Sequence, residues 1–322
     1  MSSTVFGFGA LDRWMDDDAV SEVLVNAGCE VWIERVDGPP GAQYVGKLAP
    51  GAIDVILERI LTPIGRRLDR TSPVVDARLP DGSRVCAVLP PVSTDGPCLA
   101  VRRFRRRIVD LSCFGPPSVC ALIDEVVAAR CNVLVSGATS SGKTSLLNAV
   151  AGRLTAPERI ITLEDTAELQ LRAPHVLRLE CRPATTDGIG EVTMGTLLRA
   201  ALRLRPDRIV VGEVRGAEAG ELVQALNTGH DGSMSTIHAN SPSDALLRLE
   251  SLVVQSGVGW TERTTREHVS RSVDVVIHVV RSAHGVRFID QICEVSHDAS
   301  GERTRSLATS QVVVDVLRRG RR

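Results

Sequence analysis

The chain has 322 residues, of which 43% are hydrophobic and 24% charged, which is the composition of a soluble globular protein able to bury a core. Its 38 basic and 39 acidic residues give a formal net charge of −1, so no general electrostatic attraction to nucleic acid follows, although local basic patches stay open. Aromatic residues make up only 3%, a share that disfavours the base-stacking platforms of proteins that bind single-stranded nucleic acid.

The N-terminus, the apolar runs and the cysteines together indicate where the protein works. The N-terminal residues lack the basic and apolar regions of a secretory signal, and no apolar run approaches the roughly 20 residues of a membrane span. The strongest apolar stretch, Val275 to Val280, is short and contains His278. The eight cysteines include no C-x-x-C pair, so we expect reduced thiols and no structural zinc. A cytoplasmic protein is expected, which can still attach to a membrane complex.

The length favours two domains, and the first third of the chain has the pattern of a small α+β domain. Four apolar runs separated by turn residues predict strands, and the last two flank Pro80-Asp81-Gly82 as a hairpin. Between the pairs, residues 52–68 have the apolar spacing of a helix that Pro63 should kink or end. We place this domain at residues 1–104. The expected strands cover residues 23–26, 30–34, 74–79 and 83–88.

A second domain is expected after a basic run. Arg102 to Arg107 is too charged for a core, so it ends the first domain or belongs to a linker at residues 105–112. Beyond it, strands alternate with amphipathic helices, which indicates an α/β domain at residues 113–322 with helices on both faces of a parallel sheet. Residues 275–280 and 286–295, with a last polar segment, are expected to add strands at one edge.

The sharpest motif lies where an apolar strand, Asn132 to Ser136, runs into G-x-x-x-x-G-K-T and then into a helix-compatible run. Glycines let the backbone approach phosphates, N–H groups point inward, and the positive end of the next helix lies there. Lys143 would reach the β- and γ-phosphates, and the Thr144 hydroxyl would bind Mg²⁺. The motif predicts a nucleoside-triphosphatase fold without specifying which one. The expected nucleotide-binding residues are Gly137, Ala138, Thr139, Ser140, Ser141, Gly142, Lys143, Thr144 and Ser145.

Two further strands end in acidic residues, where a doubly wound sheet would place its site. Residues 159–163 lead into Glu164, Asp165 and Glu168, and residues 209–211 lead into Glu213. Such carboxylates can hold Mg²⁺ with its water shell, and one can act as general base. For the first three the alternative is helix capping and first-turn charge, whereas a carboxylate at Glu213 has little structural use. Thr144, Glu164 and Glu213 are therefore candidate Mg²⁺ ligands.

A polar segment with two histidines, His230 and His238, follows the second acidic strand. Their spacing does not indicate a metal site, no cysteine lies near, and a lone histidine here would more often be a satisfied polar residue. Arg215, just after the second acidic strand, is either a salt-bridge partner or a functional residue, and the sequence favours neither.

Four sequence motifs resemble those of the type II/type IV secretion and pilus traffic ATPase family, and they follow one another along the chain in that family's order. The string G-H-D-G-S-M-S-T-I-H-A-N most resembles the branch that serves Flp/Tad tight-adherence pili, whose relatives drive type IV secretion and conjugation. The likeness extends over about residues 11–295 and includes V-S-E-V-L-V-N and D-A-R-L-P-D-G-S-R-V near the N-terminus. The motifs are the Walker A at Gly137–Thr144, the Asp box at Glu164–Glu168, the Walker B at Ile209–Glu213 and the His box at Gly229–His238.

This resemblance implies a RecA-like P-loop ATPase domain, ATP and Mg²⁺ as cofactors, and a homo-hexameric ring whose ATP cycle moves the N-terminal domain against the motor. It implies Glu168 as general base, Glu213 as the Walker B carboxylate near Mg²⁺, and both histidines, His230 and His238, around the γ-phosphate. Arginines of the N-terminal domain close over the phosphates in this family. Arg84 and Arg102 occupy the matching places, with Arg103 a close competitor to Arg102.

The resemblance also implies a motor at the inner face of the cell membrane that powers Flp/Tad-type pilus assembly or type II/IV secretion and contacts an inner-membrane platform protein. The four-cysteine zinc insertion of some relatives is absent from the sequence. We also expect the chain to lack the extra N-terminal docking domains of some relatives, which leaves its anchoring open. The main alternative is a conjugative-transfer or DNA-linked type IV secretion motor.

Three other classes of protein are alternatives to this resemblance. The basic runs 102–107 and 318–322 motivate a nucleic-acid motor, but such runs are more often solvated faces, linkers or contacts to acidic lipids. We therefore expect no direct sequence-specific binding of nucleic acid. A regulator that does not hydrolyse nucleotide would suit a chain without the acids, and no L-S-G-G-Q signature of an ABC-type ATPase is present.

Overall fold

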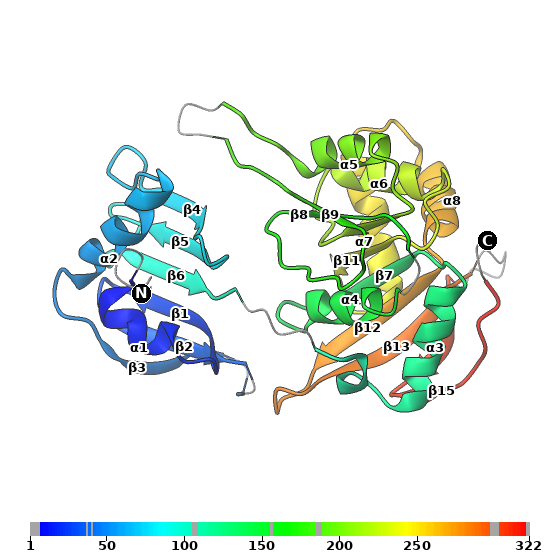
Figure 1. Cartoon of the computed structure of the whole chain (residues 1–322), viewed down its shortest axis with the longest axis horizontal. Helices are drawn as coiled ribbons and strands as arrows, with labels where there is room; N and C mark the ends of the chain where they lie inside the picture. The colour runs from blue at the N-terminus through cyan, green and yellow to red at the C-terminus, as the bar shows by residue number, and fades with distance from the viewer. Residues whose placement is uncertain are drawn as a thin grey trace. The chain divides into compact units, whose positions relative to one another are not determined.

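The computed structural model describes residues 7–36, 38–39, 41–104, 109–154, 157–184, 189–296 and 303–319. The chain divides into two compact units, Met1–Arg106 with Ser282–Val286, and Arg107–Arg281 with Arg287–Arg322. Each unit has its own sheet and core and is described by itself (Figure 1). Of the predicted linker, residues 105–108 lie outside the described residues.

The first unit is an antiparallel sheet with its main helix, α2, contributing to the core (Figure 1). The strand order is β3-β2-β1-β6-β5-β4, and alternate residues such as Val23, Val25 and Val85 are buried with Ile53 and Ile56 of α2. The short helices are η1 (Gly9–Leu11), α1 (Asp12–Met15) and η2 (Thr62–Ile64), beside α2 (Ala52–Leu61). The strands are β1 (Val20–Asn26), β2 (Glu30–Arg35), β3 (Gln43–Lys47), β4 (Val74–Arg78), β5 (Arg84–Val88) and β6 (Cys98–Arg102).

The predicted elements of this unit are mostly confirmed. β4 and β5 pair as the expected antiparallel hairpin around Pro80-Asp81-Gly82. The helix expected at 52–68 is too long, because α2 ends at Leu61 and Pro63 lies in the 3-10 turn that follows. Proline has no N–H and clashes with the preceding turn, so the α-helix cannot continue through it.

The second unit is a mixed sheet with helices on both faces, as predicted. The described strands follow the order β15-β14-β13-β12-β7-β11-β10-β8-β9. Neighbouring strands from β12 to β9 run parallel, and β13, β14 and β15 are added antiparallel at one edge. The strands are β7 (Val133–Gly137), β8 (Ile160–Glu164), β9 (Val176–Glu180), β10 (Arg208–Val211), β11 (Met234–His238), β12 (Val275–Arg281), β13 (Arg287–Val295), β14 (Thr304–Thr309) and β15 (Val312–Val313).

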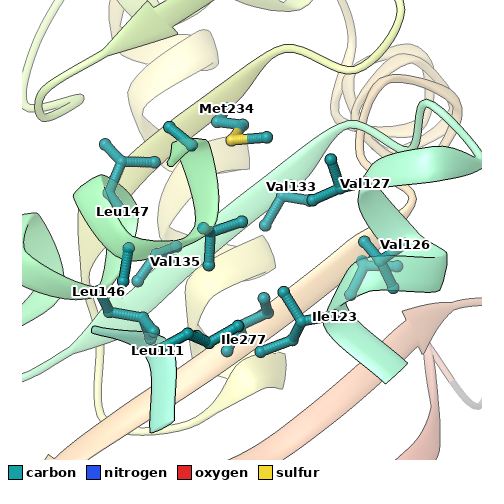
Figure 2. Packing of buried hydrophobic residues seen from close by; sticks show 14 of the residues in the cluster. Leu111, Ile123, Val126, Val127, Val133, Val135, Leu146, Leu147, Met234 and Ile277 are labelled. Atoms are coloured by element: carbon teal, nitrogen blue, oxygen red, sulfur yellow. The ribbon is translucent and has the colours of Figure 1, made fainter. Parts of the chain in front are cut away.

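Two apolar layers cover this sheet. On one face, α3 and α4 pack over β7 and β12, where Ile123, Val135 and Leu146 are buried together (Figure 2). On the other face lie α5, α6, α7 and α8. No helix in the described ranges is long and apolar enough to cross a membrane. The helices are η3 (Leu111–Cys113), α3 (Pro117–Ala128), α4 (Lys143–Ala151), α5 (Met194–Arg203), α6 (Glu218–Leu226), α7 (Pro242–Gln255) and α8 (Glu262–Ser272).

The register of the central strands brings the sequence motifs to one edge. β11 pairs in parallel with β7 so that His238 lies opposite Gly137. β10 pairs in parallel with β8 so that Val211 lies opposite Leu163. Because parallel strands end at the same edge of a sheet, the segments after β7, β8, β10 and β11 converge there, which is the usual place for a ligand site in such folds.

Candidate functional site

The phosphate loop lies between β7, which ends at Gly137, and α4, which begins at Lys143. This confirms the strand–loop–helix arrangement expected from the motif. Ser140 and Gly142 have left-handed backbone conformations, with φ of 59° and 99°, and the loop tip is exposed. The first N–H groups of an α-helix have no partner within the helix, and the positive end of its dipole lies there. The loop is therefore suited to an anion such as phosphate.

The loop also packs tightly against the β12–β13 hairpin. A Cβ atom on Gly137 would lie 2.4 Å from the carbonyl oxygen of Val279, and one on Gly142 would lie 2.6 Å from Cδ of Arg287. Gly137 is thus required by its close approach to backbone, whereas at Gly142 the left-handed φ of 99° is what disfavours a side chain. Sequence reasoning missed Arg287, because no motif surrounds it and it is far from Gly142 in the chain.

A series of polar contacts links Lys143 to the second acidic strand. The ammonium of Lys143 donates to the carbonyl oxygen of Ala138 at 3.0 Å and lies 3.0 Å from Nδ1 of His238. Nε2 of His238 lies 2.8 Å from Oε1 of Glu213, a close contact that does not have the geometry of a hydrogen bond. Oε2 of Glu213 accepts a 2.6 Å hydrogen bond from Arg215. With Nδ1 accepting from the ammonium, Nε2 carries the proton toward the carboxylate.

Burial and charge act in opposite directions on Glu213. Burial by itself would raise the pKa of Glu213, but the hydrogen bond from Arg215 and the charges of Arg215, His238 and Lys143 lower this pKa overall. Burial, and then the charge of Lys143, lowers the pKa of His238. At neutral pH the site therefore contains an ionised Glu213 and a neutral His238, a state in which the carboxylate can bind a hard divalent cation.

The first acidic segment is held by Glu164, which ends β8 and is 2% exposed. Its Oε1 atom accepts 2.8 Å hydrogen bonds from the N–H groups of both Glu168 and Leu169. Its Oε2 atom is buried with no hydrogen-bond partner in the described part of the chain. Burial raises the pKa of Glu164 to about 7 despite these two hydrogen bonds. Asp165 forms a 3.5 Å ion pair with Arg215, which thereby joins the two acidic segments.

His230 does not lie beside the phosphate loop of its own chain. The expectation that it lies around the γ-phosphate there is therefore wrong. It precedes β11, whereas His238 ends β11 opposite Gly137, so the length of a strand separates the two histidines. Nδ1 of His230 lies 3.1 Å from the carbonyl oxygen of Ala225 at the end of α6. The structure thus brings His238, Lys143 and Glu213 together and leaves His230 at the opposite edge of the sheet.

Arg84 and Arg102 lie in the first unit, opposite each other on neighbouring strands β5 and β6. Arg84 forms a 3.3 Å ion pair with Asp76, and Arg102 lies 3.7 Å from Glu22. Arg103 instead donates to the carbonyl oxygens of Asp17 and Val20, with its side chain only 15% exposed. Of the two competing arginines, Arg103 anchors the turn before β1, and Arg102 has its side chain 57% exposed.

The residues at the loop fit a nucleoside triphosphate with a divalent cation. Oγ of Ser141 and Oε1 of Glu213 are buried without a hydrogen-bond partner in the described ranges, although buried polar atoms nearly always have one. Phosphate oxygens accept hydrogen bonds from hydroxyl and N–H groups, and a hydrated Mg²⁺ accepts carboxylate and hydroxyl oxygens. Gly137–Ser145 would hold the phosphates, and Thr144 with Glu213 would hold the cation.

Comparisons with known proteins show the family of the chain. A family model described as "Type II/IV secretion system protein" matches residues 6–318. The "Putative conjugal transfer protein Rv3659c" of Mycobacterium tuberculosis is 40% identical over 304 residues, covering 91% of this chain and 85% of that protein. The "Conjugal transfer protein TrbB" of Rhizobium radiobacter is 34% identical over 282 residues, covering 85% and 83%.

The solved structure of the ATPase DotB from Yersinia pseudotuberculosis has a TM-score of 0.65 at 17% identity, covering 90% of this chain and 79% of that one. At this identity the likeness shows the fold alone, which is the RecA-like fold of secretion ATPases. The family model, however, spans nearly the whole chain, and both relatives are more than 30% identical over most of it. The chain belongs to the type II/IV secretion system protein family, and as a secretion ATPase of that family it binds and hydrolyses ATP.

Proposed function

We propose that the protein hydrolyses ATP in a Mg²⁺-dependent reaction at the edge where β7, β8, β10 and β11 end, and that this reaction drives a secretion or pilus machine. The observation that carries the proposal is the contact series from Lys143 through His238 to Glu213, directly beside the phosphate loop. Bound Mg²⁺ would supply charge stabilisation for the transferring phosphoryl group.

Each residue of the site receives a task in this proposal. Lys143 and the N–H groups of the loop bind and orient the phosphates, and Glu168 accepts the proton of the attacking water. Glu213 stays ionised toward the cation, and neutral His238 keeps both Lys143 and Glu213 in position. Arg84 and Arg102 are proposed to act on the phosphates, a role that rests on the family resemblance.

A Lys143→Ala variant tests the site. Phosphate release should fall to background, because the variant loses the cation that meets the β- and γ-phosphates. Arg263→Ala is the matched control, since Arg263 is an exposed cation on α8 that pairs only with Glu267 in the described structure. Wild-type turnover in Lys143→Ala would refute the assignment of the phosphate loop.

We further propose a homo-hexamer on the cytoplasmic face of the inner membrane, in contact with a platform protein of the machine. The family resemblance supports this assembly, and light scattering with and without Mg²⁺ and a non-hydrolysable ATP analogue tests it. A monomer under every condition, including with membranes present, would contradict the ring.

Two machines are candidates. The His-box string favours Flp/Tad-type pilus assembly, and the names of the relatives from Mycobacterium tuberculosis and Rhizobium radiobacter favour conjugal transfer. A strain without this gene, complemented with wild type or Lys143→Ala, separates them. Loss of surface pili with normal plasmid transfer supports the first machine, and loss of plasmid transfer with normal pili supports the second.

A further inference from the structure

We propose that Glu164 is a positioning residue for the general base Glu168 and not a magnesium ligand. The inference rests on the proposed function, because it assigns to Glu164 a task that is carried out through Glu168. It replaces the role that the sequence alone suggested for a carboxylate at the end of β8.

The hydrogen bonds of Glu164 carry the inference. One oxygen, Oε1, accepts from the backbone N–H of Glu168 and from that of Leu169, both at 2.8 Å. The side chain at the end of β8 therefore fixes the backbone of the proposed base itself. Turning Oε1 toward a cation would leave the N–H of buried Leu169 without its partner, which native proteins rarely tolerate. The other oxygen, Oε2, is buried with no hydrogen-bond partner in the described ranges, so the variants below test whether it faces a cation.

The packing around Glu164 leaves it little freedom to take another position. A Cβ atom on Gly212 would lie 3.0 Å from Cγ of Glu164, so its methylene groups pass directly over the backbone at Gly212. Gly212 immediately precedes Glu213. The side chain is thus confined between the two acidic segments, and its position is coupled to that of both.

Two outer contacts hold the rest of the same segment. Arg215 pairs with Asp165 at 3.5 Å while donating to Glu213. Asn148 of α4 accepts a 2.9 Å hydrogen bond from the N–H of Gln170. The segment from Asp165 to Gln170 is therefore attached to the phosphate-loop helix, to Arg215 after the second acidic strand and to β8. Glu164 supplies the hydrogen bond to the N–H of Glu168.

Glu164→Gln and Glu164→Ala form the decisive pair of variants. Glutamine keeps an acceptor oxygen in place of Oε1 and removes the charge, so a positioning residue should tolerate it with kcat close to wild type. Alanine removes the acceptor, and kcat should fall roughly 100-fold, the cost of misplacing a reacting group by about 1 Å. KM and the affinity for a fluorescent ATP analogue should stay near wild type in both variants.

Hydrogen exchange at the amides of Glu168 and Leu169 gives a readout that does not depend on turnover. Protection should be lost in Glu164→Ala and kept in Glu164→Gln. Glu164→Asp, which keeps the charge but shortens the side chain, should behave like alanine and serves where alanine prevents folding. If the wild-type protein fails to hydrolyse ATP, the proposed function fails, while the exchange data still decide whether Glu164 fixes this segment.

Two results would overturn the inference. One is a Glu164→Gln variant that loses turnover as Glu213→Gln does and needs more Mg²⁺ for the remaining activity, because that is the behaviour of a metal ligand. The other is unchanged protection of both amides in the alanine and aspartate variants, which would show that the hydrogen bonds to Glu164 do not fix this segment.

Discussion

At the scale of single residues, Glu213 is the carboxylate whose charge matters most. The hydrogen bond from Arg215 and the neighbouring cations keep it ionised despite its burial. Glu213→Gln should retain ATP binding but lower kcat by roughly 100-fold or more, because the neutral amide no longer holds a cation that supplies several kcal/mol of charge stabilisation. Phosphate release and binding of a fluorescent ATP analogue, measured on the same preparation, check this. Glu267→Gln, an exposed position on α8, is the control and should leave both unchanged.

Glu164 gives a prediction about stability and pH. Burial raises its pKa from 4.5 to about 7 in the folded state, so the folded chain binds this proton more tightly than the unfolded chain. The free energy of unfolding should therefore decrease as pH rises from 4.5 to 7, by up to about 3 kcal/mol for this group alone.

The Glu164→Gln variant lacks this titration. As pH rises from 5 to 8, the free energy of unfolding of this variant should increase relative to that of wild type. Urea unfolding at each pH measures this difference, with Glu267→Gln again as the control. A difference between wild type and Glu164→Gln that does not change with pH would show that Glu164 is ionised throughout or accessible to water.

The convergence of the phosphate loop and Glu213 at one sheet edge was predictable, because each directly follows an apolar strand and parallel strands end at one edge. His230 was not, because its place depends on where β11 begins. Eight positions separate it from His238, and the strand between them carries the two to opposite edges. The contact of Arg287 could not be recognised from the sequence, since only the fold brings β13 against Gly142.

At the scale of elements, the contact between β7 and β12 depends on Gly137. A methyl group there would meet the carbonyl oxygen of Val279 at 2.4 Å and Oγ of Ser141 at 2.5 Å. Gly137→Ala should destabilise the protein by roughly 1–3 kcal/mol or more, as overpacking of a tight core does. Urea unfolding of the variant beside wild type gives the difference.

Gly152→Ala provides the comparison within the same region. Gly152 is the C-terminal cap of α4 with φ of −66°, an ordinary helical conformation that alanine adopts readily. Its effect on stability should be small. Equal losses of stability in Gly137→Ala and Gly152→Ala would mean that the close contact of β12 with Gly137 is not the reason why a side chain is unfavourable at position 137.

The sequence patterns predicted whether most elements are helices or strands, but not at which residue each one begins and ends. The β4–β5 hairpin and the strand before the phosphate loop were predicted, because turn residues and apolar runs act locally. The end of α2 was placed too late, although the proline that ends it was recognised. β9 was not predicted: all five of its residues are half-buried or exposed, so no strong apolar pattern marks it.

For the whole molecule, the order of strands could not be read from the sequence. β12 lies between β7 and β13, and β11 lies on the other side of β7, so neighbours in space are distant in the chain. Such an order results from the packing of two helical layers on one sheet, which no local pattern encodes. The likeness to a known family predicted the RecA-like class of the fold, but not this order.

Nucleotide binding should stabilise the whole second unit, because the proposed phosphate-binding loop follows β7 in the middle of its sheet. A ligand at 100 times its Kd adds about 2.7 kcal/mol to the free energy of unfolding, which for a unit of this size raises Tm by roughly 5–10 °C. Differential scanning calorimetry with a non-hydrolysable ATP analogue and Mg²⁺ measures this rise. Removing the cation with EDTA should reduce the rise, and Lys143→Ala should abolish most of it. A rise of the same size in Lys143→Ala would place the bound nucleotide elsewhere on the molecule.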